Sequence, residues 1–122
     1  MAKILIADDD AHIIRVMAIW LQRHGHECST AANGKEALDI VQSRCPEILI
    51  TDMNMPILDG VELAKAVRAD GISIPILMLT ARCDQEALNE DLETYAVRVF
   101  PKPFLPSQLV VEIDRLLNPV SP

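Results

Sequence analysis

Carboxylates dominate the residues of this sequence that could do chemistry. A run of three, Asp8–Asp10, follows the first apolar segment, and Asp52 follows a later one. Hard oxygen ligands of this kind favour Mg²⁺, Mn²⁺ or Ca²⁺ over zinc. Thr80 and Lys102 follow two further apolar segments and supply hydrogen-bond donors, which suit a phosphate group rather than a cation. The set indicates a site for a divalent cation and a phosphoryl group.

Electrostatics supports this interpretation if the residues converge. Two carboxylates about 4 Å apart repel by about 4 kcal/mol at an effective dielectric constant of about 20. A cluster of Asp8, Asp9 and Asp52 therefore requires a cation, raised pKa values or a function that justifies the repulsion. One divalent cation together with Lys102 would balance the three negative charges. The charge balance predicts a metal-assisted phosphoryl site with a carboxylate nucleophile.

Short apolar runs alternate with longer amphipathic ones, and this alternation predicts the elements that position the site. We expect strands at residues 3–7, 27–31, 48–51, 75–79 and 97–100, of which 27–31 is the most polar and suits a sheet edge. We expect helices at residues 11–24, 34–44, 61–70, 84–94 and 106–117. Strands that alternate with helices pair in parallel through right-handed crossovers. The expected α/β fold is an open five-stranded parallel sheet with helices on both faces, and its ligands bind where the carboxyl ends of the strands meet.

Each candidate residue also has a purely structural interpretation. Asp10 is best assigned as the N-cap of the first helix, and Asp59 with Gly60 as a turn. Thr80 could cap the loop after its strand, and Lys102 could extend into water. The functional interpretation depends on the combination of these residues and not on any one of them.

Composition limits the function classes. The chain has 122 residues, 50% hydrophobic and 24% charged, so one domain with a packed core is expected over residues 1–122. Its net charge of −7 and its few aromatic residues (3%) argue against binding to nucleic acid or an anionic membrane. No apolar run approaches the roughly 20 residues that span a bilayer. The three widely spaced cysteines are expected to be inert thiols in a reducing, cytoplasmic compartment.

Four segments give the chain a family resemblance. They are Ile4–Asp10, Ile48–Gly60 (ILITDMNMPILDG), Leu79–Ala81 and Lys102–Phe104. In order and spacing they resemble the signatures of the receiver domain of two-component response regulators, in its single-domain, chemotaxis-regulator-like form. The resemblance implies a flavodoxin-like, doubly wound (βα)5 fold with strand order 2-1-3-4-5.

The resemblance also implies a role for each acidic residue. Asp52 would be the phosphorylated carboxylate. Asp9, Asp52 and the backbone carbonyl of Asn54 would bind Mg²⁺, with Mn²⁺ as an alternative. Asp8 would act through a metal-bound water.

The phosphoryl group would have its own ligands in the same resemblance. Lys102 would pair with one phosphoryl oxygen, the Thr80 hydroxyl would donate to another, and the Ala81 N–H would lie nearby. The Lys102–Pro103 bond is expected to be cis.

Val99 departs from the family pattern, which usually has an aromatic switch residue at this position. Phe100 is adjacent, but alternation along a strand turns its side chain to the opposite face. We therefore do not expect Phe100 to replace the aromatic residue.

The expected function is signalling rather than enzymatic turnover. Asp52 would take a phosphoryl group from a phosphohistidine of a sensor histidine kinase or a histidine phosphotransfer protein. The modified domain would then bind a downstream protein, without direct contact to nucleic acid or insertion into a membrane. The chain would be a stand-alone regulator or relay shuttle, or alternatively an isolated receiver domain cut from a longer regulator with an effector domain.

Three other classes fit the residues less well. An aspartyl-nucleophile phosphatase needs a second Asp two residues after the nucleophile, where this chain has Asn54. A flavodoxin-like FMN module needs a loop of Ser, Thr and Gly after the first strand, where Asp8–Asp10 would repel phosphate. A purely structural adaptor would bind neither Mg²⁺ nor a phosphoryl group.

Overall fold

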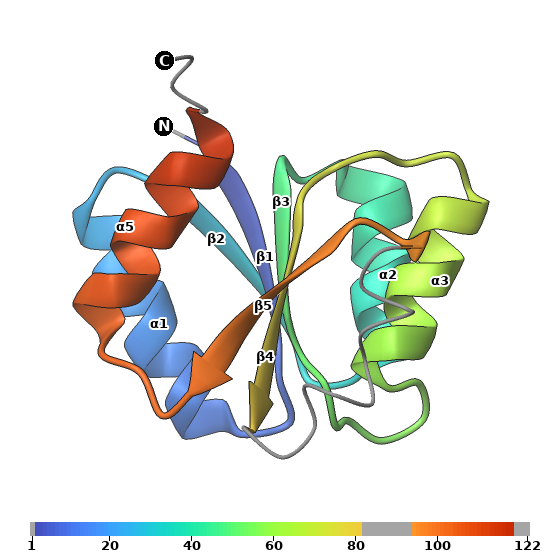
Figure 1. The fold of residues 1–122 in the computed structure, drawn as a ribbon, viewed down its shortest axis with the longest axis horizontal. Coiled ribbons are helices and arrows are strands. Elements are labelled where there is room, and N and C mark those ends of the chain that lie inside the picture. Colours follow the sequence, from blue (N-terminus) through green and yellow to red (C-terminus); the bar gives the residue numbers. More distant parts are fainter. Residues whose placement is uncertain (1, 82–93, 119–122) are drawn as a thin grey trace.

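The computed structural model describes residues 2–81 and 94–118, which form a parallel sheet between two layers of helices (Figure 1). The strands are β1 (Lys3–Ala7), β2 (Glu27–Ala31), β3 (Ile48–Asp52), β4 (Ile76–Ala81) and β5 (Val97–Lys102). The helices are α1 (Ala11–Arg23), α2 (Gly34–Arg44), α3 (Gly60–Ala69) and α5 (Pro106–Leu117). All strand pairs are parallel in the order β2-β1-β3-β4-β5, so the expected fold class and strand order are confirmed.

Alternation along the strands gives the sheet two separate cores. On one face, α1 and α5 cover Ile4 and Ile6 of β1, and on the other, α2 and α3 cover Leu5 and Ala7 (Figure 1). Strands β1 and β3 are apolar throughout most of their length because both of their faces are covered. The more polar β2 lies at the edge of the sheet, as expected.

Side-chain caps fix where two helices begin beside the carboxyl ends of the strands. The Asp10 carboxylate accepts hydrogen bonds from the backbone N–H groups of His12 (2.9 Å) and Ile13 (3.3 Å), which confirms Asp10 as the N-cap of α1. Asp59 caps α3 in a reciprocal capping box with Glu62. Asp59 is therefore structural, as expected, but it belongs to a helix start and not to a simple turn.

The strands that lead to the site end later than the sequence pattern indicates. We expected Thr80 and Lys102 to follow their strands, but each lies within the last two residues of β4 or β5. The reason is that the parallel pairing continues, since Thr80 pairs with Pro101 and Ala81 with Lys102. Asp52 is likewise the last residue of β3 and not the first of a loop. These side chains are therefore held by the sheet itself.

The helix expected at residues 84–94 lies outside the described residues, apart from Thr94. The longest described helix, α1, has 13 residues, a length of about 20 Å at about 1.5 Å per residue. Among the described residues, no helix combines the length and the apolar character needed to cross a membrane.

Arg68, near the end of α3, binds the chain at the amino ends of two strands, at the end of the sheet opposite the carboxylates. Its guanidinium donates hydrogen bonds to the carbonyls of Ile72 and Ile74, which precede β4, both at 2.8 Å. It also donates to the carbonyls of Tyr95 (2.8 Å) and Ala96 (3.5 Å), which precede β5. Partial burial lowers the pKa of Arg68, but a guanidinium stays charged in proteins. One side chain thus fixes the segments that lead into the two neighbouring strands β4 and β5.

Gly34, the first residue of α2, lies against the connection between β3 and α3. A Cβ atom at this position would overlap the carbonyl oxygen of Leu58, and a backbone atom cannot move away as the end of a side chain can. The absence of a side chain therefore lets α2 and this connection touch.

Replacement of Gly34 by Ala should lower the free energy of unfolding by about 1–3 kcal/mol, because the added methyl group overpacks the contact with Leu58. Urea denaturation measures the change. The exposed neighbour Lys35 provides a control, since Lys35→Ala should change stability by less than about 0.5 kcal/mol. Equal effects of the two substitutions would contradict the tight contact.

Candidate functional site

The carboxyl ends of β1 and β3 bring the predicted acidic residues together. The chain leaves β1 toward β2 on one side, whereas β3 lies on the other side, so the strand order reverses at this point. One carboxylate oxygen each of Asp8, Asp9 and Asp52 lies within 4.8 Å of the others. Asp8 (1% exposed) and Asp52 (8% exposed) are buried, whereas Asp9 is exposed.

Asp8 is the carboxylate whose ionisation the fold changes most clearly. Burial is the largest cause that raises its pKa from 3.8 to about 6, and the charges of Asp52 and Asp9 add to the rise. The backbone N–H of Asp10, which donates to Asp8 Oδ1 at 2.9 Å, and the ammonium of Lys102 act in the opposite direction. The net effect is a carboxylate that gives up its proton less readily than usual.

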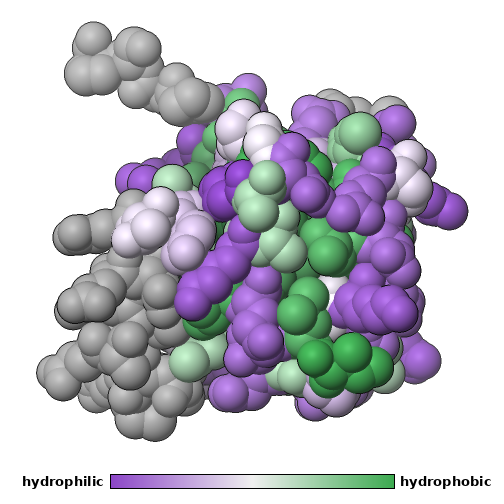
Figure 2. All heavy atoms as spheres, turned by 90° about the vertical axis from the view of Figure 1, so that its right-hand side faces the viewer, coloured by the Kyte–Doolittle hydropathy of each residue, from purple (hydrophilic) through white to green (hydrophobic). Residues whose placement is uncertain are grey.

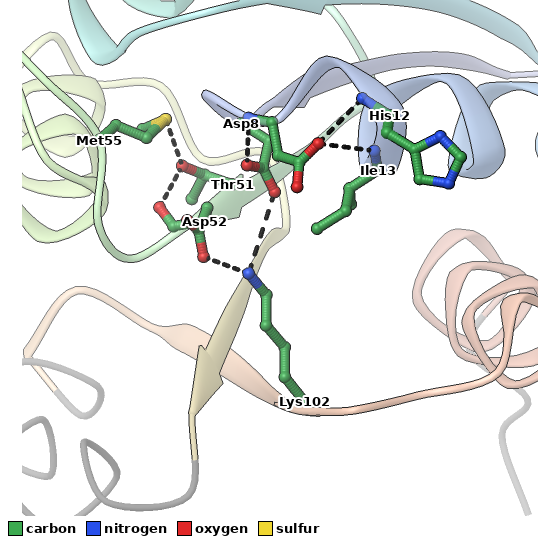
Figure 3. Close-up of polar contacts among 8 residues, drawn as sticks. Asp8, His12, Ile13, Thr51, Asp52, Met55 and Lys102 are labelled. Atoms are coloured by element: carbon green, nitrogen blue, oxygen red, sulfur yellow. Dashed lines mark hydrogen bonds and ion pairs between the residues drawn. The ribbon is translucent and has the colours of Figure 1, made fainter.

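Lys102 reaches the cluster from the end of β5. Its Nζ donates to Asp52 Oδ1 at 2.8 Å and lies 4.0 Å from Asp8 Oδ2 (Figure 3). The following Lys102–Pro103 peptide bond is cis, as expected. Beyond it, the ring of Phe104 packs edge-on against Phe100, with centroids 5.1 Å apart, which anchors the segment that carries the lysine.

Two buried oxygen atoms at this edge have no hydrogen-bond partner among the described residues. They are Oδ2 of Asp8 and the hydroxyl oxygen of Thr80, a residue only 1% exposed. A buried polar atom without a partner costs free energy that a bound ligand recovers. The Asp8 oxygen, which accepts no hydrogen bond from the described residues, suits a hydrated divalent cation, and the Thr80 hydroxyl suits an anionic oxygen. The donor set therefore fits a metal and a phosphoryl group.

Asn54 lies on the connection that leaves β3 and is exposed. With Asp9, Met55, Pro56 and Asp59 it lines an open recess of about 450 Å³. The recess shares Asp9 with the acidic cluster, so Asn54 borders the site on its solvent side.

Sequence reasoning missed Thr51, which supports Asp52 from within β3. Its hydroxyl, fully buried, donates to the backbone carbonyl of Asp52 at 2.9 Å and approaches the sulfur of Met55 at 3.9 Å (Figure 3). It therefore ties the strand end to the turn that follows. The available signal was a single hydroxyl residue in an otherwise aliphatic strand directly before the acidic residue.

Phe100 and Val99 lie as alternation predicts. Phe100 packs with the core between the sheet and α1 and α5, whereas Val97, two residues before Val99, packs on the face of α2 and α3. Val99 pairs with Met78 in β4, a member of that second core. Phe100 is therefore turned away from the face of Val99.

Comparison with known proteins agrees with this geometry. The response regulator receiver domain family matches residues 4–114. The chain is 35% identical over 121 residues to the phosphate regulon transcriptional regulatory protein PhoB of Pseudomonas aeruginosa, covering 98% of this chain and 53% of that protein. It is 34% identical to the alkaline phosphatase synthesis transcriptional regulatory protein PhoP of Bacillus subtilis, covering 95% and 48%. The chain spans about half the length of these curated relatives.

Two solved structures show the same fold over nearly their whole length. The receiver domain of the Francisella response regulator 1452 superposes with a TM-score of 0.90 at 29% identity, covering 99% of this chain and 100% of that one. The chemotaxis response regulator CheY4 of Vibrio cholerae superposes with a TM-score of 0.88 at 37% identity, covering 96% and 99%. With the family match, the strand order and the acidic edge, these similarities establish that the chain belongs to the response regulator receiver domain family of two-component systems.

Proposed function

We propose that this receiver domain is a Mg²⁺-dependent phosphoacceptor whose nucleophile is Asp52. A carboxylate oxygen of Asp52 attacks the phosphorus of a phosphohistidine, the P–N bond breaks, and the imidazole leaves with the electron pair. The observation that carries the proposal is that Asp52 lies within 4.8 Å of the other two carboxylates and 2.8 Å from the Lys102 ammonium.

Lys102 balances charge during the transfer. Its ammonium pairs with Asp52 before the reaction and with an oxygen of the incoming phosphoryl group afterwards. The strand pairing of Ala81 with Lys102 fixes the lysine backbone, and the Phe100–Phe104 contact holds the segment behind it. The lysine therefore needs only side-chain movement to follow the charge.

Asp9, Asp52 and the backbone carbonyl of Asn54 would hold Mg²⁺, or Mn²⁺, and Asp8 would contact it through water. When bound, the cation neutralises the carboxylates and the transferring phosphoryl oxygens. The hard oxygen donors support this assignment, as does the buried Oδ2 of Asp8, which has no hydrogen-bond partner among the described residues.

Thr80 and Ala81 would bind the new phosphoryl group from the end of β4. The buried Thr80 hydroxyl, which has no partner among the described residues, donates to one phosphoryl oxygen, and the Ala81 N–H serves another. Val99 is short and restricted at χ1, so it cannot fill the space beside a displaced Thr80 as an aromatic ring would.

The biological role that we propose is cytoplasmic signalling by a single receiver domain over residues 1–122, without catalytic turnover of a substrate. A sensor histidine kinase or phosphotransfer protein supplies the phosphoryl group, and a downstream protein reads it. The 37% identity to the chemotaxis response regulator CheY4 supports a stand-alone regulator or shuttle. The half-length matches to PhoB and PhoP support the alternative, a receiver cut from a longer regulator. The length of the native open reading frame decides between them.

Incubation with acetyl phosphate and Mg²⁺ should give a labile acyl phosphate on Asp52, detected by intact mass spectrometry, and EDTA should prevent its formation. Asp52→Asn should abolish the label, because an amide is not a nucleophile at neutral pH. The control is Asp59→Asn, which makes the same chemical change in an N-cap where Asn serves equally well. Labelling of Asp52→Asn at the wild-type rate would refute the assignment.

Removal of one cluster charge should stabilise the metal-free protein. Asp9→Asn is expected to raise the melting temperature in EDTA, because it relieves repulsion among the three carboxylates. A Mg²⁺ concentration of about 100 times the dissociation constant should raise the free energy of unfolding of the wild type by about 2.7 kcal/mol. The same concentration should stabilise Asp9→Asn much less. Asp10→Asn, which keeps the cap of α1, should retain the wild-type response. Equal Mg²⁺ responses of all three proteins would place the metal elsewhere.

The raised pKa of Asp8 predicts a pH dependence in EDTA. Between 3.8 and about 6 the folded state binds more protons at Asp8 than the unfolded state, so this carboxyl makes folding less favourable as the pH rises through that interval. Asp8→Asn lacks the charge, and its stability relative to the wild type should increase from about pH 4 to above pH 6. Urea denaturation of both proteins across this range measures the difference. A difference that stays constant with pH would contradict the raised pKa.

A further inference from the structure

Ile57, on the connection between β3 and α3, has a backbone conformation that its side chain disfavours. Its φ angle is 72°, and the N–H of Leu58 donates to the carbonyl of Pro56 at 2.8 Å. These values describe a three-residue γ-turn with positive φ at its centre, a rare and strained form. A β-branched residue is an outlier at positive φ, whereas Gly or Asn accepts it readily.

The surrounding contacts prevent the turn from relaxing. The Leu58 carbonyl lies against Gly34 of α2, which has no side chain to yield. The N–H of Gly60 donates to the carbonyl of Met53 at 2.8 Å, so the two ends of the connection are joined. The conformation of Ile57 is therefore imposed by its neighbours and is not relieved by a local shift.

The Ile57 side chain gains little within the fold. It is 74% exposed, more than Leu105 (62%), Val111 (60%) or Ile19 (41%), the other exposed large hydrophobic residues of the described chain. Figure 2 shows hydrophilic side chains over much of the face of α2 and α3, with hydrophobic surface from its middle to its lower end. A single exposed isoleucine is ordinary, but one that also strains the backbone and packs poorly points to a role outside the folded chain.

The place of Ile57 along the chain, five residues after Asp52, indicates what it contacts. Asp52 is only 8% exposed, so a phosphoryl donor must reach past the loops that surround the cluster of Asp8, Asp9 and Asp52. The connection that carries Ile57 starts directly at Asp52, and its residues Asn54 and Pro56 line the recess beside the cluster. A protein that inserts a phosphorylated side chain here touches this rim in every transfer, whereas a second copy of the chain or a downstream protein need not.

We propose that Ile57 is a specificity contact, seated in an apolar depression on the protein that donates the phosphoryl group to Asp52. The inference rests on the proposed function of Asp52 and adds the surface by which the donor is recognised. A small-molecule donor, which has no such surface, does not use Ile57.

The test compares a protein donor with acetyl phosphate. The protein donor is the autophosphorylated sensor kinase that phosphorylates the wild-type chain fastest among the kinases of the source organism. Ile57→Asn, which removes the apolar side chain and accepts positive φ, should lower kcat/KM for transfer from this kinase by roughly tenfold. Ile57→Val keeps most of the apolar surface and should stay within about threefold of the wild type. Both variants should match the wild type with acetyl phosphate.

Two further measurements distinguish a lost donor contact from a damaged fold. The melting temperature of Ile57→Asn should equal or exceed that of the wild type, because the strain is relieved, so slower transfer is not due to unfolding. Val111→Asn, a polar substitution at an exposed residue of α5, should leave the rates with both donors unaffected.

Three outcomes would overturn the proposal while leaving the phosphoacceptor role of Asp52 intact. They are wild-type transfer from the kinase to Ile57→Asn, an equal loss with acetyl phosphate, and the absence of any kinase that outpaces acetyl phosphate. Failure of the proposed function itself would appear differently, as labelling that persists in Asp52→Asn.

Discussion

Mutual repulsion of the carboxylates of Asp8, Asp9 and Asp52 is the constraint on which the rest of this structure depends. The groups lie within 4.8 Å of one another, and two of them are buried. Burial weakens screening by water, so the charges of Asp52 and Asp9 raise the cost of ionising Asp8. A flexible chain would relieve the repulsion by separation. Here the residues stand at the ends of paired strands, and separation would break the sheet.

The rigid parts of the fold serve to maintain this unfavourable arrangement. Both β1 and β3 are covered on two faces, and Thr51 ties the end of β3 to the turn that follows. Lys102, carried by a third strand, offsets part of the charge without removing it. The site therefore keeps a net negative charge, because one ammonium does not neutralise three carboxylates.

Much of the fold and the site could be predicted because local patterns determine them. The apolar runs before Asp8, Asp52 and Lys102 are long enough to mark strands, and parallel pairing brings their carboxyl ends to one edge. The Asp10 cap depends on neighbouring residues and was likewise predictable. The roles of these residues in phosphoryl transfer remain proposals, since they derive from the family resemblance and the geometry.

The features that could not be predicted depend on contacts between distant segments. The extension of β4 through Thr80 requires pairing with Pro101, which no local pattern encodes. Arg68 lies on an amphipathic helix as an ordinary exposed cation would, and its carbonyl partners lie as far along the chain as Ala96. The positive φ of Ile57 arises from the contact of Leu58 with Gly34 and from the closed connection around it, and its own residue type argues against it.

The Arg68 contacts have a mechanical consequence for β5. The strand is fixed at its start, where Tyr95 and Ala96 are bound to α3, and its other end carries Lys102 into the acidic cluster. Six residues at about 3.3 Å each separate these points by about 20 Å. Because β5 is also paired with β4 up to Lys102, a new charge on Asp52 would be followed by the lysine side chain while the strand keeps its place. The edge strand is thus secured at both ends, and its attachment to α3 at the remote end of the sheet helps to hold the ammonium at the acidic cluster.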